Sequence, residues 1–170
     1  FSKSPIKRTK HAGITRNAIL VAHALGIAEP EVVLLTALEF VNPDMPATVD
    51  AAALVQMNRR GQITGAYLEG PLAMDVPLSR FAAERKNIQS PVVEATDAFI
   101  APNIEAGNIL YRAILYFAKG ESGGIVVGAK VPLVLLSRAE TPETKIRSIA
   151  LALVVQHYER QKSEPQNPSS

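Results

Sequence analysis

The feature that most constrains the fold is an alternation between short apolar runs and segments with helical periodicity. Apolar β-type runs lie at residues 31–38, 63–68, 98–101, 125–127 and 131–136, and helical segments separate most of them. Strands that are apolar on both faces need cover on both sides, and helices between strands favour parallel connections. The pattern therefore predicts an α/β fold, a three-layer αβα arrangement with a mostly parallel sheet.

Helices are predicted at residues 14–25, 48–60, 79–87 and 109–119, and from residue 142 onward. Gly26 and Gly61 are expected to end the first two, and Thr48 is expected to cap the second. The last helix has the clearest signals, because Thr141 is a plausible N-cap and Pro142 suits the first position. Its apolar residues recur at helical spacing: Ile146, Ile149, Ala150, Leu153 and Val154.

Bulk properties limit the classes of function. The chain has 170 residues, which is one domain or an incomplete piece of a two-domain protein. A net charge of +2 gives no broad basic face for nucleic acid, and no apolar run approaches the roughly 20 residues that span a membrane. The absence of cysteine excludes disulfides and thiolate sites and fits a cytoplasmic location. Because the chain starts at Phe1 without a methionine, we expect residues to be missing upstream.

Several common functional motifs are absent from the sequence. Neither the dinucleotide-binding glycine pattern nor the phosphate-binding P-loop is present, and the three histidines lack metal-ligand spacing, so no metal site is expected. The stretch "GESGG" matches the nucleophile elbow of hydrolases, a motif that follows a strand and opens a helix. Here it follows a predicted helix and precedes a predicted strand. Ser122 is therefore predicted to be an ordinary loop serine.

Ligands of open α/β sheets bind beyond the carboxyl ends of the strands, and three loops fall there. They are "VNPDMPATVD", "PNIEAGN" and "SRAETPET", at residues 41–50, 102–108 and 137–144. Gly107 and Asn108 are predicted at a helix start, where backbone N–H groups favour an anion, although a turn glycine and an N-cap explain them equally well. The first loop can likewise be only a stiff connection in which Thr48 caps a helix.

Arg138 has two interpretations. It can form a surface salt bridge with Glu140 or Glu143. It also follows an apolar run on the ligand side of the expected sheet, where a guanidinium can bind a phosphate in bidentate fashion or polarise a carbonyl. The position slightly favours an anionic ligand.

Taken together, the motifs resemble those of the phosphate acetyl/butyryltransferase family. They are "NAILVAHALGI", "VNPDMPATVDAAAL", "MNRRGQITGAYLEGPLAMD", "SPV", "APNIEAGNILYRAI", "GGIVVGAKVPLVLLSRAET" and "KIRSIALA". The resemblance covers residues 14–153 in order, and it is closest to the butyryltransferase branch and to the transferase half of hydratase–transferase fusions.

The resemblance implies a reaction in which acyl-CoA and inorganic phosphate give acyl phosphate and CoA. It also implies two domains of the isocitrate/isopropylmalate-dehydrogenase-like fold, an active site in the cleft between them, and a homodimer. Family chains are longer at the amino end. Residues 1–128 then correspond to the inserted second domain, and residues 129–162 to a strand and helix that return to the first. Residues 163–170 are expected to be a disordered tail.

The resemblance also implies roles for individual residues. Ser137 and Arg138 match the catalytic Ser-Arg pair, in which serine contacts the CoA thiol and arginine stabilises charge on the carbonyl oxygen. Thr144 stands where the acetyl branch has a proposed aspartate base, which leaves Glu140, our choice, or Glu143. Substrate contacts are expected from a further set: Gly107, Asn108, Lys130, Asn42 and Thr48. No cofactor is expected, because coenzyme A is a substrate.

Two alternatives stay open. The chain can be a non-catalytic piece that folds or dimerises without a complete site. A dehydrogenase of the same fold, NAD-dependent and decarboxylating, ranks lower because it needs clustered metal-binding aspartates. The aspartates here are scattered singly: Asp44, Asp50, Asp75 and Asp97. A smaller departure from the family is Glu69, where relatives usually carry aspartate before Gly-Pro.

Overall fold

The structure is a computed structural model that describes residues 5–138 and 140–163. The chain divides into two compact units, Phe1–Tyr111 and Arg112–Ser170. The domain boundary predicted after residue 128 concerns the parent protein and stays a prediction. In the described part of the chain, no helix is both long and apolar enough to cross a membrane.

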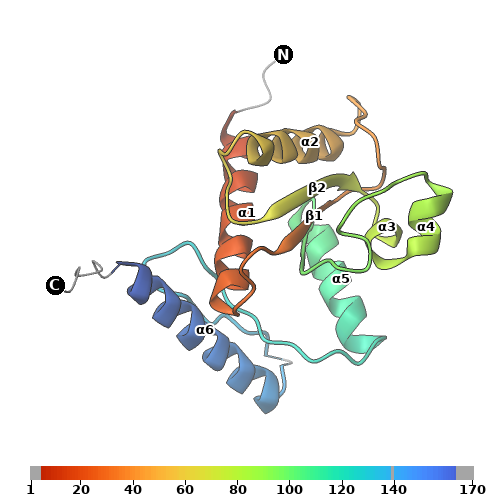
Figure 1. Ribbon diagram of the computed structural model, residues 1–170. Helices are drawn as coiled ribbons and strands as arrows, with labels where there is room; N and C mark the ends of the chain where they lie inside the picture. The colour runs from red at the N-terminus through yellow and green to blue at the C-terminus, as the bar shows by residue number, and fades with distance from the viewer. Residues whose placement is uncertain (1–4, 139, 164–170) are drawn as a thin grey trace. The chain divides into compact units, whose positions relative to one another are not determined.

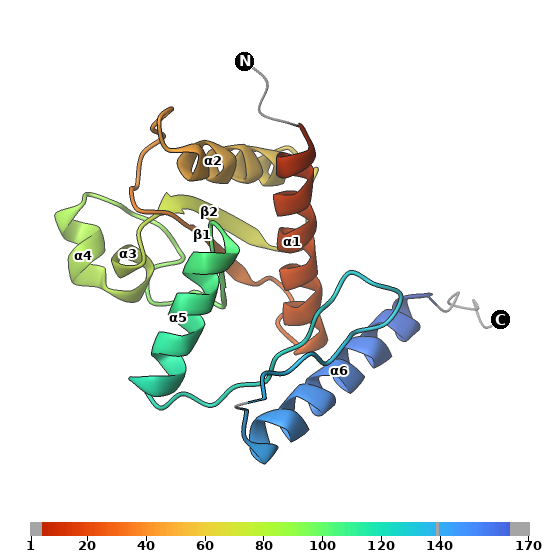
Figure 2. The same ribbon diagram turned by 180° about the vertical axis from the view of Figure 1, so that it is seen from behind.

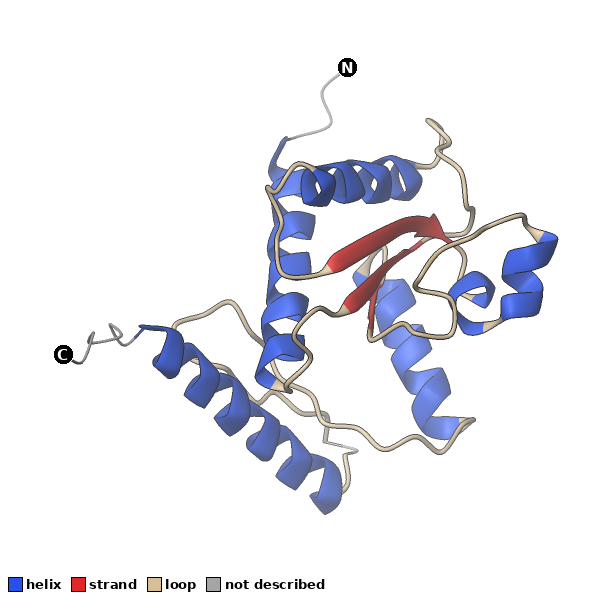
Figure 3. Cartoon of the chain, in the orientation of Figure 1, coloured by secondary structure: helices blue, strands red, loops and turns tan. Residues whose placement is uncertain are grey.

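The first unit contains a three-stranded parallel sheet (Figures 1 and 3). Its elements are α1 (Pro5–Ala24), β1 (Glu31–Leu35), α2 (Pro46–Arg59), β2 (Tyr67–Leu72), α3 (Asp75–Leu78), α4 (Arg80–Arg85), β3 (Ala98–Ile100) and α5 (Ile104–Tyr116), which continues into the second unit. The strand order is β2-β1-β3, and β1 pairs in parallel with both neighbours. The predicted α/β class with a parallel sheet is confirmed.

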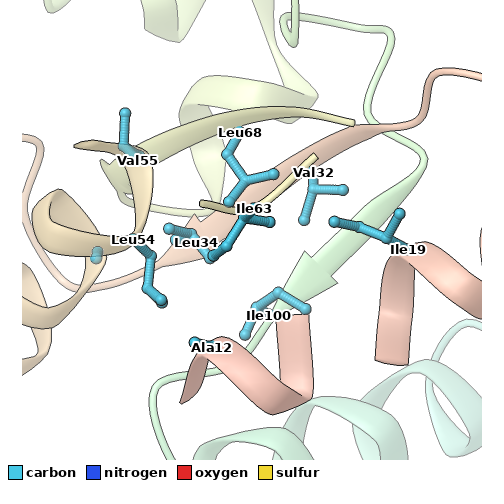
Figure 4. Packing of buried hydrophobic residues seen from close by; sticks show 10 residues of the cluster. Ala12, Ile19, Val32, Leu34, Leu54, Val55, Ile63, Leu68 and Ile100 are labelled. Carbon is cyan, nitrogen blue, oxygen red and sulfur yellow. The ribbon is translucent and has the colours of Figure 1, made fainter. Parts of the chain in front are cut away.

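Helices cover both faces of the sheet, and β1 alternates between them. Val32 and Leu34 point into a core formed with α1 and α2, whose members also include Ala12, Ile19, Ala51, Leu54, Val55, Ile63, Leu68 and Ile100 (Figure 4). Val33 and Leu35 point to the opposite face, where a second core is formed by Leu72, Val76, Ala83, Val92 and Val93, with Leu110 of α5 packed against it. Figure 2 shows α5 from this side. Period-2 alternation in a strand buried on both faces explains the continuous apolar run in the sequence.

The second strand differs from its prediction. A strand over 63–68 that stops before Gly70-Pro71 was expected, but β2 includes both residues, joined by a cis peptide bond. Proline is tolerated because β2 is an edge strand in the described sheet and pairs only with β1. Gly70 has φ +150°, and an added Cβ would lie 2.8 Å from the Leu34 Cβ. The glycine therefore lets two backbones approach closely rather than ending the strand.

The second unit contains α6 (Pro142–Ser163) and a loop with little β-structure. The strands predicted at 125–127 and 131–136 are reduced to one antiparallel bridge, in which Val126 and Leu133 exchange two hydrogen bonds of 2.8 Å. Leu135 is 81% exposed. A strand is stable only when a neighbour pairs with its N–H and C=O groups, and the described part of the chain supplies no further partner here.

Helix α6 begins as predicted, with the N–H of Thr144 donating to Oγ1 of Thr141 at 3.3 Å. Its apolar stripe, however, is not covered in the described chain, since Ile149 and Leu153 are 53% and 60% exposed. The residues that α6 buries are Thr144, Ser148 and Val155. The predicted tail begins one residue too early, because Ser163 is the last residue of α6, and residues 164–170 lie outside the described part.

Candidate active site

The predicted Ser-Arg pair lies in a tight turn immediately before α6. The backbone N–H of Glu140 donates to the carbonyl oxygen of Ser137 at 3.1 Å, which closes the turn. Ser137 and Arg138 are both exposed. The alternative interpretation of Arg138 as a salt-bridge residue gains no support, because within residues 5–138 and 140–163 no carboxylate pairs with it. Two exposed residues, Ser137 and Arg138, thus lie next to each other directly before α6.

The sequence suggested a salt bridge between Glu140 and Arg138, but the cationic partner of Glu140 is Arg112. Nη1 of Arg112, on α5, lies 3.3 Å from Oε1 of Glu140. The Glu140 side chain is only 8% exposed, so its carboxylate faces the guanidinium in a largely desolvated place. Arg112 was not singled out from the sequence. A basic residue in an otherwise amphipathic helix gives no signal of a specific partner.

Thr144 is the residue expected to stand where the acetyl branch has its proposed aspartate base. Thr144 is buried, and its Oγ1 lies 3.3 Å from Oγ1 of Thr141. Its carbonyl accepts a hydrogen bond of 2.7 Å from Ser148, whose Oγ in turn accepts from the N–H of Gly124 at 2.9 Å. Thr144 therefore helps to attach the glycine-rich loop to α6, and its hydroxyl cannot take a proton from a thiol at neutral pH.

The loop "GESGG" lies along α6 and has no strand before it. Oε1 of Glu121 pairs with Nη2 of Arg147 at 2.8 Å. A Cβ added to Gly123 would lie 3.1 Å from the carbonyl carbon of Arg147, so the loop backbone runs close to the helix. Ser122 sits in this loop with no helix opening after it, as predicted. Lys130 is exposed in the bend between the two bridge residues.

Glu143 is the other carboxylate near the turn. A hydrogen bond from its own backbone N–H, another from the Thr141 side chain and the nearby charge of Arg147 lower the pKa of Glu143. Each of these contacts favours the ionised carboxylate. A lower pKa makes a weaker base, so Glu143 is less suited than an unperturbed carboxylate to accept a thiol proton.

Asn42 and Thr48 are brought together in the first unit, but not as predicted. Thr48 is not the N-cap of α2; Met45 occupies that position, and Thr48 is buried in the first turn. Its Oγ1 accepts from the N–H of Asn42 at 2.9 Å and lies 2.8 Å from the Met45 carbonyl oxygen. Asn42 Oδ1 accepts from the N–H of Asp44 at 2.9 Å. The stiff-loop interpretation accounts for these contacts.

Gly107 and Asn108 do not begin a helix. Helix α5 starts at Ile104, and Oδ1 of Asn103 accepts from the N–H of Ala106 at 2.8 Å as an N-cap does. The N–H of Gly107 donates to the Asn103 carbonyl at 3.1 Å, so it is not available to an anion. A Cβ on Gly107 would lie 3.3 Å from that of Ala101, a close approach of helix and strand end. The Pro-Asn-Ile-Glu order could have identified Asn103 as the cap.

Glu69 is tied into a polar cluster on β2. Its Oε2 accepts from Tyr67 Oη at 3.0 Å and from Ser90 Oγ at 3.1 Å, and its Oε1 accepts from the N–H of Gly70 at 3.1 Å. Burial and the charge of Glu69 raise the pKa of the Tyr67 phenol. Among the described residues, no group of three or more His, Asp or Glu side chains is arranged to hold a metal ion.

Comparisons with known proteins agree on one family. The profile of the family described as phosphate acetyl/butaryl transferase matches residues 3–153. The chain is 48% identical over 142 residues to the phosphate butyryltransferase of Clostridium acetobutylicum, covering 84% of this chain and 47% of the relative. It is 49% identical over 138 residues to the phosphate acetyltransferase of Thermotoga maritima, covering 81% and 47%.

A solved structure is also similar to most of this chain. The crystal structure of a branched-chain phosphotransacylase from Enterococcus faecalis V583 superposes with a TM-score of 0.78 at 34% identity, over 87% of this chain and 54% of that chain. The chain thus spans about half the length of the curated relatives it matches. By the match of its sequence and of its fold, it belongs to the phosphate acetyl/butaryl transferase family.

Proposed function

We propose that this chain contributes the Ser-Arg part of the active site of a phosphate acyltransferase, which converts acyl-CoA and inorganic phosphate into acyl phosphate and CoA. The observation that carries the proposal is the exposed Ser137–Arg138 turn, which lies inside the region matched by the family. Because the chain spans about half of its relatives, the activity belongs to a whole protein in which other residues complete an interdomain cleft.

In the proposed reaction, a phosphate oxygen attacks the thioester carbonyl carbon, the C–S bond breaks, and CoA leaves as a thiolate that takes up a proton. The Arg138 guanidinium stabilises the negative charge that develops on the carbonyl oxygen, an effect worth several kcal/mol in a dry site. The Ser137 hydroxyl donates a hydrogen bond to the CoA sulfur. Coenzyme A is a substrate, and the proposal includes no cofactor.

The other residues that were predicted to contact substrate are supported to different degrees by the structure. Lys130 and Asn108 are exposed and suited to the phosphate groups of CoA. Asn42, Thr48 and Gly107 use their polar groups within the chain, so any contribution to binding comes through loop shape. Glu140 is proposed as the base that takes up the thiol proton when CoA is the nucleophile, in the reverse direction of the reaction. A homodimer in the cytoplasm is the proposed state of the parent protein.

The test is phosphate-dependent release of thiol from butyryl-CoA. The whole protein that contains this chain, and in parallel the chain alone, are incubated with butyryl-CoA with and without phosphate or arsenate, and free thiol is followed over time. Arg138→Ala is expected to lower anion-dependent release by about 100-fold or more, because alanine offers no charge to the developing oxyanion. Arg160→Ala, a substitution of an exposed arginine on α6, serves as the control and should leave release unchanged. Release that survives Arg138→Ala would remove Arg138 from the mechanism.

The second candidate is a non-catalytic piece of such an enzyme. It is favoured by the half-length match and by the uncovered apolar stripe on α6. Calorimetric titration with CoA separates the two candidates. Saturable binding together with anion-dependent thiol release supports a working site, whereas a folded chain that neither binds CoA nor releases thiol supports the non-catalytic candidate.

A further inference from the structure

The pairing of Arg112 with Glu140 has a consequence for the neighbouring turn. The Glu140 side chain is 8% exposed and that of Arg112 is 36% exposed, with Nη1 and Oε1 at 3.3 Å. A carboxylate that is removed from water needs a compensating charge or hydrogen bonds. The Arg112 guanidinium supplies that charge from α5, 28 residues earlier in the chain. The ion pair therefore restrains the Glu140 side chain.

Glu140 also connects the turn to α6. Its N–H closes the turn by donating to the Ser137 carbonyl at 3.1 Å, and the next residue, Thr141, caps α6 through the N–H of Thr144. Because the backbone of Glu140 is hydrogen-bonded to the turn and is followed directly by the cap of α6, holding its side chain in place also limits the movement of the turn backbone. Arg138 is exposed and has no carboxylate partner in the described chain. The direction in which its side chain leaves the protein therefore depends on the backbone of the turn.

We propose that Arg112 is a positioning residue for Ser137 and Arg138: by binding the Glu140 carboxylate, it holds the turn in the shape that presents the pair. In naming the pair catalytic, this inference rests on the proposed function. It gives the Glu140 carboxylate a role as an anchor, because this carboxylate is the group that Arg112 binds. Arg112 itself does not need to touch the substrate.

The first experiment measures hydrogen exchange of the Glu140 amide by NMR in the whole chain. Arg112→Gln is expected to reduce protection of this amide by about tenfold or more, because the buried carboxylate loses its counter-charge. Arg112→Lys retains a positive charge and should restore most of the protection. Arg80→Gln is the matched control, since Arg80 pairs with the exposed Glu94 in the first unit and should leave the Glu140 amide unchanged.

Unchanged protection of the Glu140 amide in Arg112→Gln overturns the inference. The amides of Val126 and Leu133, which bond across the bridge, report whether the unit is still folded. If the Val126 and Leu133 amides also lose protection in Arg112→Gln, the Glu140→Gln variant is measured instead. In that variant the amide of residue 140 should lose protection while the Val126 and Leu133 amides stay protected. An unchanged amide at residue 140 would overturn the inference. The double variant should lose no more than either single variant, because both remove the same pair.

Kinetics separate positioning from a general contribution to stability. In an active protein, Arg112→Gln should lower kcat while the KM for acyl-CoA changes by less than about twofold, and Arg112→Lys should recover much of kcat. A raised KM at unchanged kcat contradicts positioning. Absence of thiol release in every variant, wild type included, counts against the proposed function alone, since the exchange data still decide on Arg112.

Discussion

At the residue scale, polar residues in the loops after strands differ in whether they bond within the chain. Position in the sequence predicted that Asn42, Thr48, Gly107 and Asn108 meet a ligand, but the structure shows that Asn42, Thr48 and Gly107 use polar groups within the chain. Ser, Thr and Asn often bond to nearby backbone in this way. Ser137 and Arg138 are placed differently, because both residues are exposed at a turn that the Glu140 N–H closes by donating to the Ser137 carbonyl.

The Thr48 contacts make a testable contribution to stability. Thr48→Val keeps the shape of the side chain but removes the acceptor for the Asn42 N–H and the donor to the Met45 carbonyl. The Met45 carbonyl keeps the bond from the Thr48 N–H, but the Asn42 N–H loses its acceptor, which should lower the free energy of unfolding by about 1–3 kcal/mol. Urea denaturation measures the change, and Thr64→Val, at an exposed position, should cost little. Equal effects of the two substitutions would contradict a specific role for Thr48.

At the element scale, the sequence predicted helices that overlap α1, α2, α5 and α6 and strands that overlap β1, β2 and β3, because each has local periodicity or a cap; it missed the first part of α1, which begins at Pro5. The predicted ends of several helices and strands were wrong, because tertiary contacts determine where those elements end. Helix α5 starts at Ile104 because Asn103 caps it, and β2 continues through Gly70 because the backbone of β1 lies against it. Residues 131–136 have strong strand propensity, but a strand also needs a pairing partner, and no local pattern reveals whether one is present.

Two glycines test this distinction between local and tertiary requirements. Gly70→Ala should destabilise the chain by about 2 kcal/mol or more, since the new Cβ would lie 2.8 Å from Leu34 Cβ at a φ of +150°. Gly13→Ala, inside α1, meets nothing within 4 Å and should stabilise by about 0.5–1 kcal/mol. Denaturation midpoints measure both. The local interpretation of Gly70 as a simple strand stop would gain support if Gly70→Ala were neutral.

At the scale of the whole molecule, the chain spans about half the length of its family relatives, and its exposed apolar surface agrees with that. Leu133, Leu135 and the α6 stripe are exposed, although apolar side chains at regular helical spacing are typical of a buried face. The core of the first unit, by contrast, is closed on both sides of its sheet. This exposed apolar surface therefore lies in the unit that also contains Ser137 and Arg138.

The uncovered stripe predicts self-association of the isolated chain. Ile146, Ile149 and Leu153 lie on one face of α6 and are each more than half exposed, so burying them against another copy gains about 25 cal/mol per Å² of apolar area. Analytical ultracentrifugation across a concentration series should detect oligomers. Leu153→Glu should shift the distribution toward monomer, because a charge in the contact must be desolvated.

The control for this prediction separates lost apolar contact from altered net charge. Lys145→Gln changes the charge by the same single unit as Leu153→Glu, at an exposed residue of α6 outside the stripe. It should leave the association constant almost unchanged, whereas Leu153→Glu should weaken association by about tenfold, as expected when one buried leucine is replaced by a charge. Equal effects of both substitutions would assign the association to charge. A monomer at all concentrations would show that this much exposed apolar surface is tolerated in solution.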